Sequence, residues 1–100
     1  MSYRIRVSRK AAAQIREACA WWLANRTKAP RAFEEELERG FVLASSMPAV
    51  GEPVAHPRPG IRRILLGRIR YYLYYRVSRR TETVEILSLW HTSRGTRPDL

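Results

Sequence analysis

Strand-like patterns occur at the start of this 100-residue chain and again throughout its second half. Residues 3–7 alternate apolar with basic side chains, which is typical of a half-buried β-strand. After Gly60, strand-forming residues return in three runs, at 61–66, 70–77 and 83–90, and short turn segments separate them. Three strands joined in this way predict an antiparallel meander.

Between the first strand and the meander, the apolar period changes to that of helices. Ile15, Cys19, Trp22 and Leu23 share one helical face. Ser8 lies just before this segment and is a residue type that caps helices. The pattern fades near Asn25, where we expect the first helix to end.

A second helix is expected to run back antiparallel, because the linker at residues 25–28 is short. Pro30 is acceptable in its first turn, and Pro48 ends it. The apolar stripe of this helix consists of Phe33, Leu37, Phe41 and Ala44. These four positions predict that the helix packs on the sheet together with Ile15, Cys19 and Leu23.

Residues 48–60 hold four prolines and two glycines, which predicts an extended loop without regular structure. The order of elements is therefore strand, helix, helix, strand, strand, strand. The two helices should cover one face of an antiparallel sheet, which is a two-layer α+β architecture. A chain of this length is expected to form one domain, at 1–100.

The middle strand of the meander divides its side chains between the two faces of the sheet. One set faces the helices: Tyr71, Leu73, Tyr75 and Val77. The other set should lie on the uncovered face: Arg70, Tyr72, Tyr74 and Arg76. This second set is too aromatic for an ordinary solvated surface, so we interpret it as a surface that binds a partner.

The charge of the chain points to acidic partners. Nineteen Lys and Arg residues against nine Asp and Glu give a formal net charge of +10. Arginine dominates, and its planar guanidinium binds phosphate or carboxylate and stacks on aromatic rings. Charge alone cannot separate nucleic acid from an acidic protein as the partner.

Several classes of protein are not expected. The apolar runs are shorter than the about 18 residues of a membrane span, and the N-terminal residues lack the apolar region of a secretory signal. Cys19 is the single cysteine, which excludes an intrachain disulfide and fits a reducing cytoplasm.

The sequence also lacks the familiar catalytic and metal-binding motifs. Cys19, His56 and His91 are too few for a structural zinc site. The glutamates at 34–36 point around a helix and cannot converge on one ion. They are instead favoured near the N-terminal end of the second helix, where the helix dipole is positive. We expect neither a metal nor a cofactor.

One group of residues near the C-terminus could carry chemistry. His91 follows the last strand and is the side chain there whose ordinary pKa lies near neutrality. With Arg94, Arg97 and Arg76 close by, it could act as a general acid or base on a phosphodiester. The alternative is that His91 simply ends the strand and the arginines are solvated.

Three stretches carry a family likeness in their order and spacing. They are the loop and strand entry PxxGxPxxHPRPGIRR, the strand RYYLYYRV and the C-terminal VEILSLWHTSRGTRPDL. Together they resemble the RelE/ParE superfamily of bacterial toxins over nearly the whole chain. The resemblance implies the toxin of a type II toxin–antitoxin, or plasmid stabilisation, module. It also implies a hetero-oligomer with a small acidic or amphipathic antitoxin.

The superfamily divides by target. RelE-type members cut mRNA on the ribosome, and their middle strand often reads Tyr-Arg-Leu-x-Tyr with a catalytic arginine. Here Tyr72 stands in the arginine position, and a tyrosine, with a pKa near 10, cannot hold a fixed positive charge against a phosphate. The tail after Pro98 is too short to place a further catalytic tyrosine. The pattern is therefore closer to the ParE branch, whose members poison DNA gyrase.

Two hypotheses of function follow, and a third is weaker. The first is a gyrase-binding inhibitor without catalytic residues. The second is a ribosome-dependent mRNA endoribonuclease that uses His91, Arg94 and Arg76. A plain nucleic-acid-binding module would need a recognition helix or stacking motif that the sequence lacks. Target or antitoxin binding is expected to involve Arg62, Arg63, Arg70, Tyr72, Tyr74, Arg76, Trp90, His91 and Arg94.

Overall fold

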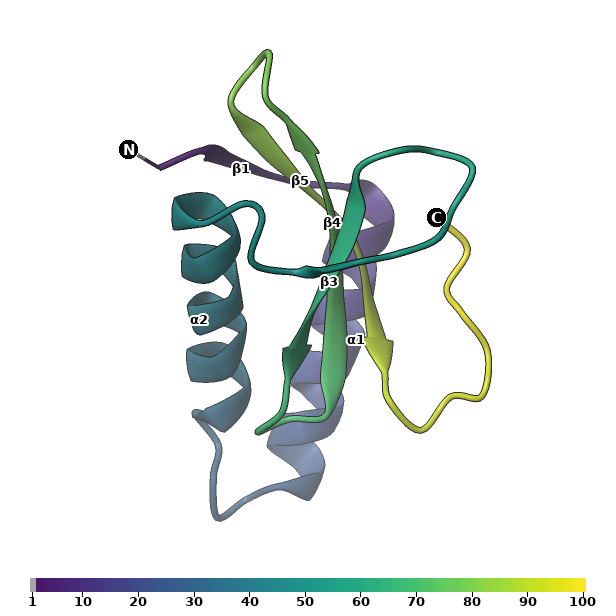
Figure 1. The fold of residues 1–100 in the computed structure, drawn as a ribbon. Helices are drawn as coiled ribbons and strands as arrows, with labels where there is room; N and C mark the ends of the chain where they lie inside the picture. Colours follow the sequence, from purple (N-terminus) through teal and green to yellow (C-terminus); the bar gives the residue numbers. More distant parts are fainter. Residues whose placement is uncertain (1) are drawn as a thin grey trace.

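The computed structural model describes residues 2–100 and contains two helices and five strands (Figure 1). In chain order they are β1 (Arg4–Val7), α1 (Arg9–Asn25), α2 (Ala32–Ser46), β2 (Glu52–Pro53), β3 (Ile61–Leu66), β4 (Tyr71–Ser78) and β5 (Thr83–His91). The strands form one mixed sheet in the order β1-β5-β4-β3-β2. β1 lies parallel to β5, whereas the other neighbours are antiparallel. The predicted α+β architecture, with its helical hairpin and C-terminal meander, is confirmed.

Local side-chain bonds explain where the helices begin and end. Ser8 caps α1 as predicted, because its hydroxyl accepts a hydrogen bond from the Ala11 N–H at 3.1 Å. The indole N–H of Trp22 donates to the Ala29 carbonyl at 2.8 Å and so fixes the turn between the helices. The two helices run in opposite directions beside each other (Figure 1). No helix in residues 2–100 is long and apolar enough to cross a membrane.

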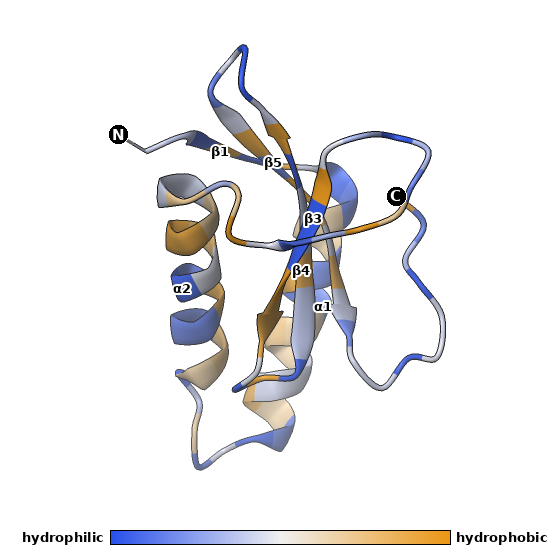
Figure 2. Ribbon diagram, in the orientation of Figure 1, coloured by the Kyte–Doolittle hydropathy of each residue, from blue (hydrophilic) through white to orange (hydrophobic). Residues whose placement is uncertain are grey.

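The helices cover one face of the sheet, here called the helix face. Leu73, Tyr75 and Ile86 are fully buried there, and Phe33 of α2 packs among them. Leu37 and Phe41 pack on the same cluster, as their spacing predicts. Figure 2 shows the end of β3 coloured hydrophobic, in contrast to the hydrophilic turn at residues 79–82.

Three details of the sequence prediction are wrong. Leu23 is 51% exposed, whereas Trp22, predicted on the same side of the helix, is buried, because successive side chains of a helix point about 100° apart. Pro30 lies before α2, which begins at Ala32. The loop at 48–60 contains the short strand β2, which pairs with β3. Pro53 is tolerated in β2 because an edge strand does not need every N–H group.

A close approach of backbone and side chain anchors the start of this loop. The Tyr75 hydroxyl donates to the Pro48 carbonyl at 2.8 Å and accepts from the Gly51 N–H at 2.9 Å. A Cβ atom at Gly51 would lie 2.5 Å from that hydroxyl and 2.9 Å from the Arg63 carbonyl. Only glycine therefore fits here, and the loop is held to the sheet at this point.

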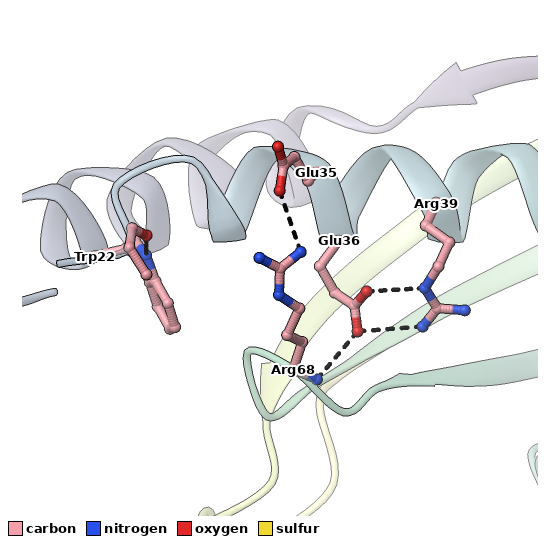
Figure 3. A network of polar contacts seen from close by, with 6 residues as sticks. Trp22, Glu35, Glu36, Arg39 and Arg68 are labelled. Atoms are coloured by element: carbon pink, nitrogen blue, oxygen red, sulfur yellow. Dashed lines mark hydrogen bonds and ion pairs between the residues drawn. The ribbon is translucent and has the colours of Figure 1, made fainter.

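Glu36 of α2 holds the β3–β4 turn against the helix (Figure 3). Its carboxylate is buried, accepts the Arg68 backbone N–H at 3.0 Å and pairs with Arg39 at 2.8 Å. The hydrogen bond from Arg39 lowers the pKa of Glu36, outweighing the opposite effect of burial. Glu35 adds an exposed ion pair with the Arg68 side chain at 3.2 Å. Glu35 and Glu36 therefore do more than interact favourably with the helix dipole, because they also bind the β3–β4 turn.

Candidate functional site

A row of stacked basic and aromatic side chains crosses the face of the sheet opposite the helices, here called the outer face. Tyr72 of β4 and Trp90 of β5 are direct cross-strand partners. The Arg63 guanidinium lies 4.0 Å from the centre of the Tyr72 ring, and that of Arg94 lies 4.3 Å from the centre of the Trp90 ring. We call these four residues the stacked row. Each guanidinium is held over an aromatic face, where the attraction is about 0.5–1 kcal/mol at an exposed site.

Arg63 is fixed by two further contacts. It donates to the Tyr74 hydroxyl at 3.3 Å and pairs with Glu52 of β2 at 2.7 Å. The hydrogen bond with Tyr74 is the main cause that raises the pKa of Arg63 above its ordinary value. The charge at this end of the stacked row is therefore held in one place before any partner binds.

The outer face is only partly open to solvent. The prediction that Tyr74 lies on an uncovered surface is therefore wrong. Tyr74 is 2% exposed and forms a second apolar cluster with Ile61 and Leu87. Val54 of the loop and Leu100 of the tail pack against this cluster. The reason is that the loop crosses the sheet on this side, and the tail returns toward it (Figure 1). Irregular backbone covers the centre of the face where open surface was predicted.

Side-chain bonds to backbone carbonyls hold this cover in place. The Trp90 indole donates to the Thr96 carbonyl at 2.8 Å, and Arg97 donates to the Ala55 carbonyl at 3.0 Å. Arg58 donates to the Leu100 carbonyl at 3.4 Å, and Lys10 also donates to the Asp99 carbonyl. The tail is therefore tied to the loop, to β5 and to α1.

The stacked row stays accessible beyond the edge of this cover. Leu65 is the cross-strand partner of Tyr72 and is 51% exposed. Tyr72 and Trp90 are half-buried and pack against the second cluster. An exposed leucine beside two rings and two guanidiniums is a surface that suits an apolar partner with acidic groups.

His91 lies on the helix face and is separate from most of the stacked row. Its ring packs edge-on against the Tyr71 ring, with centroids 4.9 Å apart. It borders a cavity that Trp21, Arg68 and Arg70 also line. Burial raises the pKa of Tyr71, although the nearby Arg94 charge acts in the opposite direction. Tyr71 therefore stays a neutral phenol beside the imidazole at ordinary pH.

The imidazole of His91 has one nitrogen engaged. Its Nδ1 accepts the Ser93 N–H at 3.1 Å and lies 2.7 Å from the Ser93 hydroxyl. A hydrogen bond of this kind selects the tautomer that carries its proton on Nε2. Nε2–H is thus left to donate a hydrogen bond to a ligand, whereas the basic lone pair on Nδ1 is engaged by Ser93.

The structure does not bring the remaining candidate arginines together. Arg62 donates to the carbonyls of Ala49 and Gly51 and holds the loop. Arg70 lies in the turn before β4 with a φ of 62°, so it does not belong to the strand. Arg76 donates to the Pro59 carbonyl at 3.0 Å, near the far end of β4 from Tyr71 and His91. Five residues of strand correspond to roughly 17 Å.

Two basic residues of the outer face were missed in the sequence. Arg4 and Arg6 of β1 line the same cavity as Arg76 of β4. The alternation of β1 predicts that the two arginines share a face, but nothing in the sequence shows that β1 pairs with β5. Among residues 2–100 there is no group of three or more His, Cys, Asp or Glu side chains that could hold a metal ion.

Comparisons with known proteins identify the family and the fold of this chain. Residues 5–95 match the family model described as the ParE toxin of the type II toxin–antitoxin system parDE. A search of curated protein sequences gave no match. The fold is similar to that of a solved chain from the chromosomal ParDE toxin–antitoxin system of P. aeruginosa, with a TM-score of 0.71 and 20% identity. That match covers 91% of this chain and 97% of the other.

Two further solved structures have a similar fold. The toxin–antitoxin complex RelBE2 of Mycobacterium tuberculosis contains a chain with a TM-score of 0.68 and 25% identity, covering 91% of this chain and 99% of that one. The E. coli toxin RelE, solved in the free state as a mutant with arginines replaced by alanine, has a TM-score of 0.62 and 18% identity. That match covers 93% of this chain and 86% of the other.

Proposed function

This chain belongs to the ParE toxin family of type II toxin–antitoxin systems, and we propose that it inhibits bacterial growth by binding DNA gyrase. A cognate antitoxin protein neutralises it by binding the toxin. In this proposal the toxin acts through a binding surface, and none of its residues is catalytic.

The stacked row is the observation that carries the proposal. Tyr72 occupies the centre of the row, with Arg63 over its ring and Trp90 beside it. The resemblance to RelE-type toxins places a catalytic arginine at this position, but a neutral phenol cannot neutralise the charge that develops on a phosphate. Aromatic rings and arginines are instead the residue types that dominate binding energy at protein interfaces. The row therefore supports target binding.

The position of His91 supports the same conclusion. A general base must reach the same reacting group as the charges that stabilise the transition state. His91 packs on Tyr71 at the helix face, whereas Arg76 lies near the far end of β4. A substrate at one of these residues is therefore far from the other.

An antitoxin partner is supported by the structural neighbours and by the surface of the chain. Two of the neighbours are described as a ParDE system and a RelBE2 toxin–antitoxin complex. The net charge of +10 favours an acidic partner. Large apolar side chains are also exposed, among them Val42 and Met47 at the end of α2 and Leu65 on the outer face. A segment that folds on binding can cover such surfaces.

The second candidate function is a ribosome-dependent mRNA endoribonuclease, and one observation favours it. His91 and Arg94 line the same cavity of about 290 Å³ at the end of α1 and β5. An imidazole and a guanidinium in one cavity are residue types that can transfer a proton and stabilise an anion. Arg76 takes no part in this arrangement.

The deciding experiment compares the wild type with His91→Gln in two purified assays, gyrase supercoiling and ribosome-dependent mRNA cleavage. We expect the wild type to inhibit supercoiling. His91→Gln should keep most of that inhibition, because one peripheral contact is rarely worth more than about 1 kcal/mol. A nuclease that uses His91 would lose roughly 10²–10⁴-fold in cleavage rate. Efficient mRNA cleavage by the wild type, abolished in His91→Gln, would favour the second function.

A second pair of variants tests the stacked row. Arg63→Gln should weaken inhibition of gyrase, since it removes the guanidinium over Tyr72. Arg16→Gln is the matched control, because Arg16 is exposed on α1 and its loss changes the net charge equally. Equal inhibition by the two variants would contradict the role of the row.

A further inference from the structure

The outer face has a second feature at the opposite end of the sheet from the stacked row. A cavity of about 470 Å³ lies where β1, β5 and β4 adjoin. Three arginines and three hydroxyl side chains line it: Arg4, Arg6, Arg76, Ser78, Thr81 and Thr83. Its volume is within the range of about 300–1,000 Å³ that small-ligand sites occupy.

The pairing of the strands explains why these residues converge. Arg4 lies opposite Thr83 across the β1–β5 pair, and Ser78 lies opposite the same threonine across the β4–β5 pair. Arg6 and Arg76 likewise both lie opposite Glu85. Directly opposed residues project to the same side of a sheet. The first and fourth strands of the chain thus place their arginines on either side of β5.

The charges in this cavity are not balanced within the described chain. Arg4 and Arg6 are exposed and form no ion pair with any of residues 2–100. Arg76 uses its Nε on the Pro59 carbonyl. Glu85 is the one acid among residues 2–100 that lines the cavity, and Arg58 of the loop lies 4.0 Å from its carboxylate. Three positive charges and one negative charge leave the cavity with a local charge of +2.

We propose that this cavity binds a phosphate group. A phosphate monoester carries a charge of about −1.5 to −2 at neutral pH, which matches the local charge of the cavity. Its tetrahedral oxygens accept hydrogen bonds from several guanidinium and hydroxyl donors at once. A single carboxylate from an acidic protein has half this charge and fewer acceptor sites. None of the described residues that line the cavity is aromatic, so recognition is through the anionic group.

This inference goes beyond the proposed function and does not depend on it. The phosphate group could belong to a phosphorylated small molecule or to the backbone of a nucleic acid. Both sources present non-bridging phosphate oxygens to the three arginines. A backbone phosphodiester carries one negative charge and a phosphate monoester up to two, and two arms of one experiment separate them.

The first arm measures pyrophosphate binding to the purified full chain by isothermal titration calorimetry at low salt. We expect saturable binding to the wild type. Arg6→Gln should bind about 5-fold more weakly or worse, because a charge-assisted hydrogen-bonding group is lost. Arg16→Gln has the same net charge and lies outside the cavity, so its affinity should stay within about twofold of the wild type, as screening limits distant charges. Circular dichroism of each variant checks that the fold is kept.

The second arm measures the binding of a short duplex DNA without terminal phosphates over a series of salt concentrations. If the cavity takes backbone phosphates, Arg6→Gln should reduce the salt slope by about 1 relative to Arg16→Gln. If it takes only small phosphorylated molecules, the salt slopes of the two variants should agree, while pyrophosphate binding is weakened in Arg6→Gln alone. Either result supports a phosphate site.

Three results would overturn the proposal. One is the absence of saturable pyrophosphate binding together with equal DNA slopes. Another is an equal loss of affinity in Arg6→Gln and Arg16→Gln, which would mean that net charge alone attracts the anion. The third is tighter binding of an Asp- and Glu-rich hexapeptide than of pyrophosphate, with the peptide affinity reduced in Arg6→Gln. This result would mean that the cavity binds an acidic protein.

Discussion

The two faces of the sheet are closed in different ways, although the same strands build both. On the helix face, Phe33 of α2 meets the buried side chains of Leu73 and Tyr75. On the outer face, the smaller cluster around Tyr74 is covered by a loop and a tail. The loop and the tail are held in place mainly by side chains that donate hydrogen bonds to backbone carbonyls, such as the Trp90 indole to the Thr96 carbonyl.

This difference separates stability from recognition. Apolar burial contributes about 25 cal/mol per Å² and is greatest where helices pack on the sheet. A typical hydrogen bond contributes only about 0.5–1.5 kcal/mol net, so the outer face adds less to folding. The helix face therefore holds the sheet in shape, and the outer face can present charged and aromatic side chains to a partner.

The largest expected difference between the faces comes from a pair of leucine substitutions. Leu73→Ala on the helix face should lower the free energy of unfolding by about 2–5 kcal/mol, because a fully buried side chain leaves a cavity. Leu65→Ala on the outer face should change it by about 0.5 kcal/mol or less, since Leu65 is half exposed. Urea unfolding measures both. Similar losses would mean that the two faces contribute equally.

Glu36→Gln tests the ion pair that joins the β3–β4 turn to α2. We expect a loss of about 1.5–3 kcal/mol in the free energy of unfolding at neutral pH, because hydrogen bonds to a charged group are among the stronger ones. The pKa of Glu36 is lowered from its ordinary value of 4.5 in the folded state. Its contribution is therefore present above pH 4.5 and is lost as the pH falls through the lowered value.

Urea unfolding over a pH series checks this dependence. The difference between wild type and Glu36→Gln should shrink on acidification below pH 4.5. Glu34→Gln, at an exposed position in the same turn of α2, is the matched control and should have a small effect. A difference that stays constant down to strongly acidic pH would contradict the role of the Glu36 charge.

Tyr75→Phe sharpens the comparison where the two faces meet. The phenol lies in the helix-face core, but its hydroxyl holds the loop that crosses to the outer face. Removing it should cost about 1–2 kcal/mol, because the Gly51 N–H loses its buried partner. Amide hydrogen exchange should accelerate at Gly51 and in the loop more than in the helices. Uniform acceleration over the whole chain would show that the loop does not open separately.

Trp90→Phe should have the smallest effect on global stability, about 1 kcal/mol or less, because it removes one hydrogen bond to the tail. Its local effect should be larger, with faster proteolysis after His91. Trp21→Phe is the control, since Trp21 is 48% exposed on α1 and is not bonded to the tail. Unchanged proteolysis in Trp90→Phe would mean that other contacts hold the tail.

The sequence predicted those parts of the fold that depend on local pattern. The strand at 61–66 and the Ser8 cap were found where the pattern placed them. The burial of Tyr74 was not predictable, because the loop and tail that cover it have no periodic pattern. The side chains of β4 that were predicted to lie on the uncovered face therefore indicated a more open surface than the structure has.

The sequence did not show how residues from distant segments come together at the candidate site. Arg63, Tyr72, Trp90 and Arg94 were identified individually, and the register of β3, β4 and β5 joins them in one row. The inward turn of Glu36 depends on the β3–β4 turn, 32 residues further on. Arg4 and Arg6 gain their neighbours only through the parallel pairing with β5.

That parallel pairing also sets the order in which the chain can complete its sheet. Among the five strands of this sheet in residues 2–100, β1 is synthesised before the others but takes its place only beside β5, where Arg4 pairs with Thr83 and Val7 with Ile86. Contacts this far apart in sequence slow folding, because a long loop must close before they form. A nascent chain that ends before Thr83 cannot form this pair. The sheet is therefore whole only after β5 has been synthesised.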